Sequence, residues 1–246
     1  MSGEYQKAHI RILEEQRNIK KKDLAVVGCP YLDVLQQKVS GLPQKDDSAF
    51  TVLVAPSWGP SAILSKYGAS LLDALVATGF HIIVRPHPQS KQVETDMLDT
   101  LEAKYRGVDT LEWDYNPENL LSLWRADIMI SDFSGVVFDY SFLFDRPFLY
   151  VNSEFDARPY DSYDIQEEPW IFRVLPAIGI ELKTEDFSKI REILLSATNS
   201  SILQENRKSA RDTAWQHRGE SGEMVAEYLM MLLDNHPAIE YSEEKK

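Results

Sequence analysis

The feature that most constrains the fold is a regular alternation of short apolar runs with longer stretches of helical spacing. Between residues 50 and 152, the runs FTVLVAP (50–56), HIIVRP (81–86) and PFLYVN (147–152) are separated by segments whose apolar residues recur every three or four positions. Short apolar runs bounded by glycine or proline are typical of buried strands, and the longer spacing is typical of helices. Strands that alternate with helices predict an α/β fold, with right-handed crossovers and a Rossmann-like parallel sheet covered by helices on both faces.

The expected organisation has three parts: an N-terminal helix or linker (1–23), a Rossmann-like domain with C-terminal helices (24–235) and a flexible tail (236–246). A proline-rich and acidic stretch at 153–177 interrupts the alternation and is expected to be a loop, as is 40–49. Glycines or prolines bound several of the predicted elements. The strands are predicted at 24–28, 50–56, 81–86, 109–113, 127–131 and 147–152, and the helices at 4–23, 63–79, 91–107, 117–126, 134–145, 184–197, 201–217 and 221–236.

Composition narrows the class of protein. The net charge of -13 disfavours binding to nucleic acid or to anionic lipid, and no apolar run approaches the ~20 residues that span a bilayer. The single cysteine, Cys29, excludes an internal disulfide, and the N-terminus has no apolar signal core, so we expect a cytoplasmic protein. No cofactor is expected. No metal is expected either, because the other four histidines show no ligand spacing: His9, His81, His217 and His236.

The stretch SDFSG (131–135) turns directly from a predicted strand into a predicted helix. Ligands of open parallel sheets bind beyond the carboxyl ends of the strands, and free N–H groups at a helix start favour an anion. We therefore expect Ser131, Asp132, Ser134 and Gly135 to lie at a phosphate site. The alternative is that Asp132 or Ser134 only caps the helix.

RPHP (85–88) follows another predicted strand. The two prolines restrict the backbone around His87, and Arg85 offers a forked donor for phosphate oxygens. His87 would either donate to the same oxygens or carry a proton near neutral pH; a purely structural histidine is the alternative. His87 and Asp132 lie in strand-end loops and are expected outside the core, whereas Val137 and Phe138 are expected inside it.

These motifs, in this order, resemble the CDP-glycerol glycerophosphotransferases, the teichoic-acid primases and polymerases and related capsule enzymes. The resemblance rests on RPHP and, about forty residues later, ADIMISDFSGVVFDYSFLFDRPFLY (126–150). VVGCPYLDVL (26–35) is similar to the family's Gly-x-Pro-x-x-Asp segment, VLVAPSWG (52–59) to its Ala-Pro-Thr-Trp turn, and GESGEMVAEYL (219–229) to its closing helix.

The resemblance implies the C-terminal, donor-binding half of a GT-B fold, which transfers an alditol phosphate from a CDP-alditol to a cell-surface polymer or lipid-linked acceptor and releases CMP. It places His87 at the donor phosphates or the leaving group, with Asp132 also catalytic. It places Ser131, Asp132, Ser134 and Gly135 around the pyrophosphate or glycerol. Ser57 and Trp58 would lie near the nucleotide, and Arg85 at the phosphates.

Two departures from the family pattern bear on this interpretation. Gly59 stands where the family usually has arginine, and the chain has no His-Gly pair of the kind that serves the acceptor in the family's N-terminal half. We therefore expect the acceptor half to come from elsewhere, with a full-length enzyme at the inner face of the membrane. A UDP-sugar glycosyltransferase or epimerase half, and a non-catalytic nucleotide-binding module, remain as alternatives.

Overall fold

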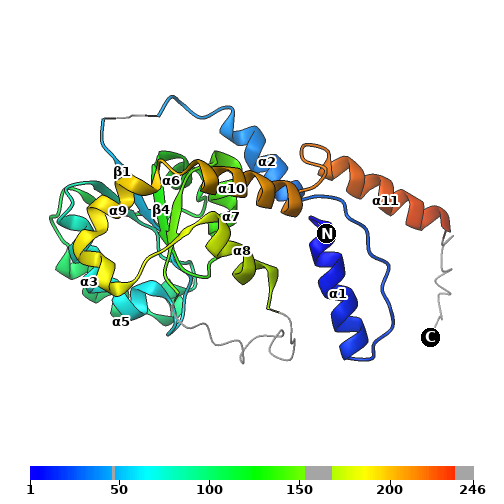
Figure 1. Ribbon diagram of the computed structural model, residues 1–246, viewed down its shortest axis with the longest axis horizontal. Coiled ribbons are helices and arrows are strands. Elements are labelled where there is room, and N and C mark those ends of the chain that lie inside the picture. The colour runs from blue at the N-terminus through cyan, green and yellow to red at the C-terminus, as the bar shows by residue number, and fades with distance from the viewer. Residues whose placement is uncertain (46–47, 153–167, 236–246) are drawn as a thin grey trace, which may run out of the picture. The chain divides into compact units, whose positions relative to one another are not determined.

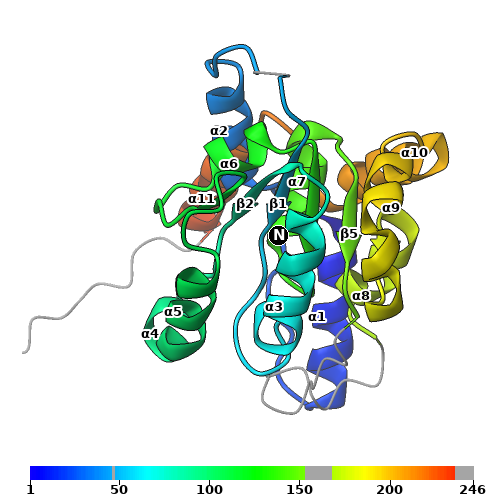
Figure 2. The same ribbon diagram turned by 90° about the vertical axis from the view of Figure 1, so that its left-hand side faces the viewer.

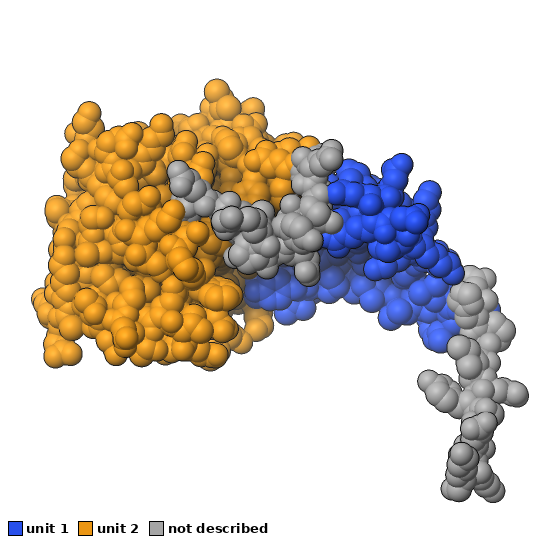
Figure 3. All heavy atoms as spheres, turned by 90° about the horizontal axis from the view of Figure 1, so that it is seen from below, with its two compact units in different colours: residues 1–37, 212–246 blue, residues 38–211 orange. Residues whose placement is uncertain are grey.

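The computed structural model describes residues 1–45, 48–152 and 168–235, and these fall into two compact units. Unit 1 contains residues 1–37 and 212–246, and unit 2 contains residues 38–211; Figure 3 colours them separately. The tail expected at 236–246 and most of the expected loop at 153–177 lie outside the described residues.

Among the described residues, unit 2 holds one six-stranded sheet in the order β3-β2-β1-β4-β5-β6, and every neighbouring pair is parallel. The parallel α/β sheet predicted from the alternation is confirmed. The central strands are built from β-branched and other apolar residues, which suit a sheet buried on both faces. The strands are β1 (Thr51–Val54), β2 (His81–Val84), β3 (Leu111–Trp113), β4 (Ile128–Ser131), β5 (Phe148–Tyr150) and β6 (Ile180–Glu181).

Helices cover both faces of this sheet. Figures 1 and 2 show α3, α5 and α9 on one face and α6 and α7 on the other. The bounds are α3 (Ile63–Val76), α4 (Ser90–Val93), α5 (Thr95–Lys104), α6 (Leu120–Arg125), α7 (Val136–Phe144), α8 (Trp170–Ile178), the 3₁₀ helix η1 (Thr184–Lys189) and α9 (Ile190–Ala197); α2 (Pro30–Val39) and α10 (Ser201–Ala214) each contain a unit boundary.

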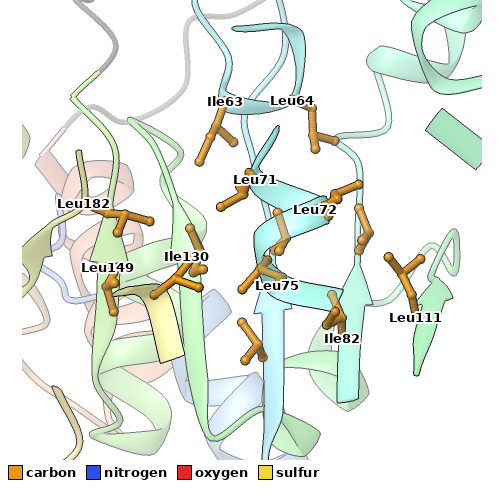
Figure 4. Close-up of a cluster of buried hydrophobic side chains, with 14 of the residues drawn as sticks. Ile63, Leu64, Leu71, Leu72, Leu75, Ile82, Leu111, Ile130, Leu149 and Leu182 are labelled. Carbon is orange, nitrogen blue, oxygen red and sulfur yellow. The ribbon is translucent and has the colours of Figure 1, made fainter. Parts of the chain in front are cut away.

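A core cluster lies between α3 and the sheet. Leu71, Leu72 and Leu75 recur at helical spacing and point towards strand residues such as Ile82 and Ile130 (Figure 4). Each of these five side chains is fully buried. Burial of one such side chain contributes about 1.5–3 kcal/mol, so this face fixes the sheet from which the loops project.

Unit 1 is joined by hydrogen bonds between its two chain segments. It contains α1 (Glu4–Gln16) and α11 (Ser221–Asn235). The carboxylate of Asp33 accepts the indole N–H of Trp215 at 2.8 Å and the backbone N–H groups of Gly219 and Ser221, both at 2.9 Å.

Across all described residues, no helix combines the length and the apolar character needed to cross a bilayer.

Several predicted elements differ from the structure. Residues 24–28 form no strand, because the backbone of this segment bonds the chain's first residue: Met1 N–H donates to Ala25, and Val27 and Gly28 N–H donate to Met1. The helix predicted at 91–107 is broken at Glu94, and helix α2, which precedes the expected loop at 40–49, was not predicted. Helix α8 replaces the C-terminal end of the expected loop at 153–177.

Candidate functional site

The carboxyl ends of β2, β1 and β4 lie side by side, because these strands are neighbours in a parallel sheet. The prediction that the loops after these strands meet at one edge is confirmed. The β1–α3 loop carries Ser57 and Trp58, the loop after β2 carries His87, and the β4–α7 turn carries Asp132 and its neighbours. All of these residues belong to unit 2.

Asp132 holds two of these loops together. Its carboxylate accepts N–H groups from Ser57 at 2.9 Å and Ile63 at 3.0 Å across the sheet edge, and from Ser134 at 3.1 Å within its own turn. Burial raises the pKa of Asp132, although these three hydrogen bonds favour the carboxylate. The expectation that Asp132 lies outside the core is wrong, since only 1% of the residue is exposed.

Two serines of the predicted site are also buried. The Ser131 hydroxyl donates to the carbonyl of Ala55 at 2.5 Å and is fully buried, so it is not presented to a ligand. The buried Ser57 hydroxyl lies close enough to Asp132 to oppose the rise in its pKa, but it makes no hydrogen bond of good geometry. Ser57 therefore combines an anchored backbone with a hydroxyl that lacks a well-aligned partner.

Arg85 is paired within the protein. One guanidinium nitrogen bonds the carboxylate of Asp114, and another donates to the carbonyl of Asn116, both at 2.5 Å. Burial alone would raise the pKa of Asp114, but hydrogen bonds from Ser122, Asn116 and Arg85 outweigh burial and lower it. The forked donor predicted for a phosphate is therefore engaged with Asp114, and the loop after β3 supplies its partner.

His87 is oriented by its own loop. The backbone N–H of Gln89 donates to Nδ1 of His87 at 3.1 Å. Burial lowers the pKa of His87, while the nearby carboxylates of Asp132 and Glu94 act in the opposite direction. The ring of Trp58 lies beside the imidazole, with centroids 6.4 Å apart and planes at 32°. His87 is half-buried and Trp58 is 43% exposed, so both reach the surface.

Glu94 belongs to this site, although sequence analysis did not single it out. It lies at the junction between α4 and α5, and its Oε1 accepts the N–H of Gly59 at 3.1 Å and the hydroxyl of Ser65 at 2.7 Å. It thereby joins the loop that carries Trp58 to the segment that follows His87. The only local signal is an acidic residue within a helical pattern, which is common on solvated helix faces.

The start of α7 is open to solvent. Gly135 is exposed, has α-helical dihedral angles, and would place a Cβ with no atom within 4 Å. Neither backbone strain nor packing therefore requires glycine here, whereas close approach of a ligand would.

The neighbours of Gly135 differ in burial. Ser134 is half-buried, and Val137 is in the core as predicted. Phe138, also predicted in the core, is only half-buried and packs its ring against Trp170.

The titratable group Asp139, on α7, was missed by the prediction from sequence. Burial raises the pKa of Asp139 to about 6, and Asp139 follows Gly135 by four positions, which places both on one helix face.

Within the described ranges, no three histidine, cysteine or acidic side chains are grouped as metal ligands would be.

Comparison with solved structures defines the class of fold. The wall teichoic acid polymerase TagF, in a histidine-to-asparagine variant soaked with CDPG, aligns with a TM-score of 0.54, 16% identity and 95% of this chain. A putative UDP-N-acetylglucosamine 2-epimerase from Listeria monocytogenes aligns at 0.53, with 13% identity over 86% of this chain, and a UDP-GlcNAc 2-epimerase from Methanocaldococcus jannaschii at 0.51, with 14% over 88%. The fold is thus the Rossmann-like α/β type of GT-B glycosyltransferases and epimerases.

The sequence defines the family more closely. The family described as CDP-Glycerol:Poly(glycerophosphate) glycerophosphotransferase matches residues 5–168, and the chain belongs to this family of transferases. The chain spans 54–57% of the three solved chains above, or a little over half of each. No curated protein matches it in a direct sequence comparison.

Proposed function

We propose that this chain is the donor-binding part of a CDP-glycerol, or other CDP-alditol, glycerophosphotransferase. The observation that carries the proposal is that the family match over residues 5–168 includes the whole strand-end site, from Ser57 to Gly135. In the proposed reaction, an acceptor hydroxyl attacks the phosphorus of the alditol phosphate and CMP leaves. The acceptor would be a cell-surface polymer or a lipid-linked precursor.

The site residues divide into two proposed groups. Trp58, His87, Ser134 and Gly135 reach the surface and would contact the donor. Trp58 offers a ring face to the nucleobase, His87 a ring nitrogen to the phosphates, and the turn of Ser134 and Gly135 its N-terminal helix dipole to the same charge. Because Arg85 is paired with Asp114, its charge would be only partly available to the phosphates. Neutral N–H donors would therefore contribute most of the phosphate binding.

The second group would support the first. Asp132 fixes the backbone at Ser57 and Ser134, Ser131 fixes the end of β1, and Arg85 fixes the loop after β3. We therefore propose that Asp132, predicted as catalytic, acts by positioning. Within this set, the buried Ser57 hydroxyl has no well-aligned hydrogen-bond partner, so it could bond an oxygen of the bound CDP-alditol.

We further propose that residues 24–235 act together as the donor-binding region and that a separate part supplies the acceptor site. The chain spans little more than half of the solved chains that share its fold, which supports this division. The enzyme would work at the cytoplasmic side of the membrane. No cofactor or metal enters this proposal.

The proposal is tested with the purified chain by thermal unfolding and calorimetric titration against CDP-glycerol, CDP, CMP, UDP and inorganic pyrophosphate. A ligand at one hundred times its dissociation constant stabilises the folded state by about 2.7 kcal/mol. We expect cytidine nucleotides to raise the melting temperature and pyrophosphate alone to leave it unchanged. A preference for UDP would favour the UDP-sugar alternative, and no response to millimolar CDP-glycerol would contradict the proposal.

Transfer is tested separately by following CMP release from CDP-glycerol with and without a lipid-linked acceptor analogue. If the acceptor site lies elsewhere, this chain alone should bind donor but release negligible CMP, because transfer needs the acceptor hydroxyl held against the phosphorus. Robust acceptor-dependent release by this chain would contradict the proposed division of the enzyme.

A further inference from the structure

We propose that His87 is held by the main chain as a neutral imidazole with its proton on Nε2, so that it acts on the donor as a hydrogen-bond donor rather than as a general base. This inference deepens the proposed function and depends on it for the identity of the ligand. Of the two roles open to His87, hydrogen-bond donor to phosphate oxygens or proton acceptor, the inference selects the first.

The argument starts from the contact between Gln89 and Nδ1. The Gln89 N–H is a donor at 3.1 Å, so Nδ1 must accept with its lone pair. A neutral imidazole has one N–H, and with Nδ1 occupied as an acceptor that proton lies on Nε2. The flanking Pro86 and Pro88 restrict the backbone of this turn, which keeps the ring and the Gln89 N–H in register.

The surroundings of the ring agree with this assignment. A proton on Nδ1 would face the Gln89 N–H, and burial of the ring also disfavours the cation. The charged groups that act on the ring are Asp132, from the β4–α7 turn, and Glu94, from the α4–α5 junction; both favour the cation but do not outweigh burial. Trp58 lies against the ring and adds no charge.

The consequence is chemical. With Nε2–H directed away from the Gln89 contact, the ring offers one proton to an oxygen of the donor pyrophosphate. Such a bond stabilises negative charge that develops on the leaving phosphate, without removing a proton from the acceptor. A base for the acceptor hydroxyl would then have to come from another group.

The tautomer is tested without any ligand. Long-range ¹H–¹⁵N spectra of the uniformly labelled chain at pH 7.5 distinguish protonated from unprotonated ring nitrogens, and the His87→Gln variant assigns the signals by their loss. We expect Nε2 protonated and Nδ1 unprotonated. A ring protonated on Nδ1, or on both nitrogens, would overturn the inference whatever the ligand proves to be.

The role is tested by two variants in calorimetric titrations with CDP-glycerol. The glutamine amide nitrogen reaches the position of Nε2, whereas the asparagine amide reaches only that of Nδ1. We expect His87→Gln to bind within about threefold of the wild type, and His87→Asn to bind about ten- to a hundredfold more weakly, as for loss of a hydrogen bond to a charged group. Equal losses of affinity in both folded variants would overturn the role of His87 as a hydrogen-bond donor. Absence of CDP-glycerol binding by the wild type would instead contradict the proposed function.

A separate set of contacts assigns Glu94 as a positioning residue for the pair of Trp58 and His87. Its Oε1 holds Gly59, whose φ of +96° turns the backbone directly after Trp58, and it also holds Ser65 on α3. Glu94 would thereby fix the spacing of the two rings. Its carboxylate also acts electrostatically on His87, so it would set the charge beside the imidazole as well.

The test uses Glu94→Gln, Glu94→Ala and, as a control, the exposed acid on α9 in Glu192→Ala. Glutamine keeps an acceptor oxygen but loses the charge, so the NMR titration midpoint of His87 should fall while CDP-glycerol affinity stays within about threefold. Alanine should lower both the midpoint and the affinity, the latter about tenfold. A melting-temperature change without either effect would reduce Glu94 to a structural role and overturn this assignment.

Discussion

Two buried aspartates, one in each unit, use the same hydrogen-bonding arrangement in different surroundings. Asp33 in unit 1 accepts three N–H groups, from Trp215, Gly219 and Ser221, and Asp132 in unit 2 accepts three from Ser57, Ile63 and Ser134. Each carboxylate thus joins segments far apart in the sequence. In both cases the three N–H donors give the carboxylate a structural role.

The difference lies in the groups that each aspartate organises. The Trp215 side chain held by Asp33 is itself buried, whereas the turns held by Asp132 present Trp58 and Gly135 to solvent. The pKa values also shift in opposite directions. Burial would raise both, but the hydrogen bonds to Asp33 outweigh burial and lower its pKa, whereas burial dominates at Asp132 and raises it.

The largest expected effect comes from removing either carboxylate. Asp33→Ala and Asp132→Ala each leave three N–H groups without their acceptor, at about 1–3 kcal/mol for each group that stays buried. We expect both variants to lose at least about 3 kcal/mol in urea unfolding. Under conditions where both are folded by circular dichroism, only Asp132→Ala should lose affinity for CDP-glycerol. Equal affinities would break the distinction between the two aspartates.

The pH dependence of stability should separate them by sign. A lowered folded-state pKa at Asp33 gives stability that is present above the unfolded value of about 4 and lost as pH falls through the folded value. A raised pKa at Asp132 has the reverse effect, so its contribution is lost as pH rises from about 4 through the raised value.

Urea unfolding of the asparagine variants from pH 3 to 7 checks this sign. The stability gap between the wild type and Asp33→Asn should narrow as pH falls below about 4. The gap between the wild type and Asp132→Asn should instead narrow as pH rises. Asp139 also titrates near pH 6, so the comparison is repeated in an Asp139→Asn background. Gaps that change in the same direction would contradict the assigned shifts.

Trp58→Ala should have a small effect on stability and a larger one on binding. The side chain is 43% exposed, so we expect a stability change of less than about 1 kcal/mol. Loss of base stacking costs about 1–3 kcal/mol, or about five- to 150-fold in affinity. The matched control is Tyr31→Ala in unit 1, where the aromatic side chain is 53% exposed. Similar losses of affinity in both variants would argue against stacking at Trp58.

Local sequence patterns were sufficient for the four central strands of the sheet but not for edge strand β6 or for the surroundings of the sheet. β1, β2, β4 and β5 are apolar runs bounded by glycine, proline or polar residues, and these boundaries predicted them to within two residues. The run LAVVG at 24–28 has the same composition, yet its backbone bonds Met1 rather than another strand. Composition alone does not reveal where a segment finds its hydrogen-bond partners.

The site residues show the same limit. The predicted parallel sheet made it possible to expect that the loops after its strands would meet at one edge. It did not reveal that Asp132 would be buried, because two of its donors lie 69 and 75 positions away in sequence. Nor did it reveal that Arg85 would pair with Asp114 from the loop after β3. Residue type indicated the location of the site, and long-range contacts determined which side chains are exposed within it.

The central claim, that a donor binds at the start of α7 in unit 2, is tested most directly by two glycine variants. Gly135 and Gly222 each lie at the start of a helix, and a Cβ added at either would meet no atom within 4 Å. Both alanine variants should therefore keep the wild-type stability within about 0.5 kcal/mol. In parallel calorimetric titrations with CDP-glycerol, we expect Gly135→Ala to lose at least about tenfold in affinity and Gly222→Ala to match the wild type. Unchanged binding by Gly135→Ala, with the wild type binding normally, would contradict the placement of the donor.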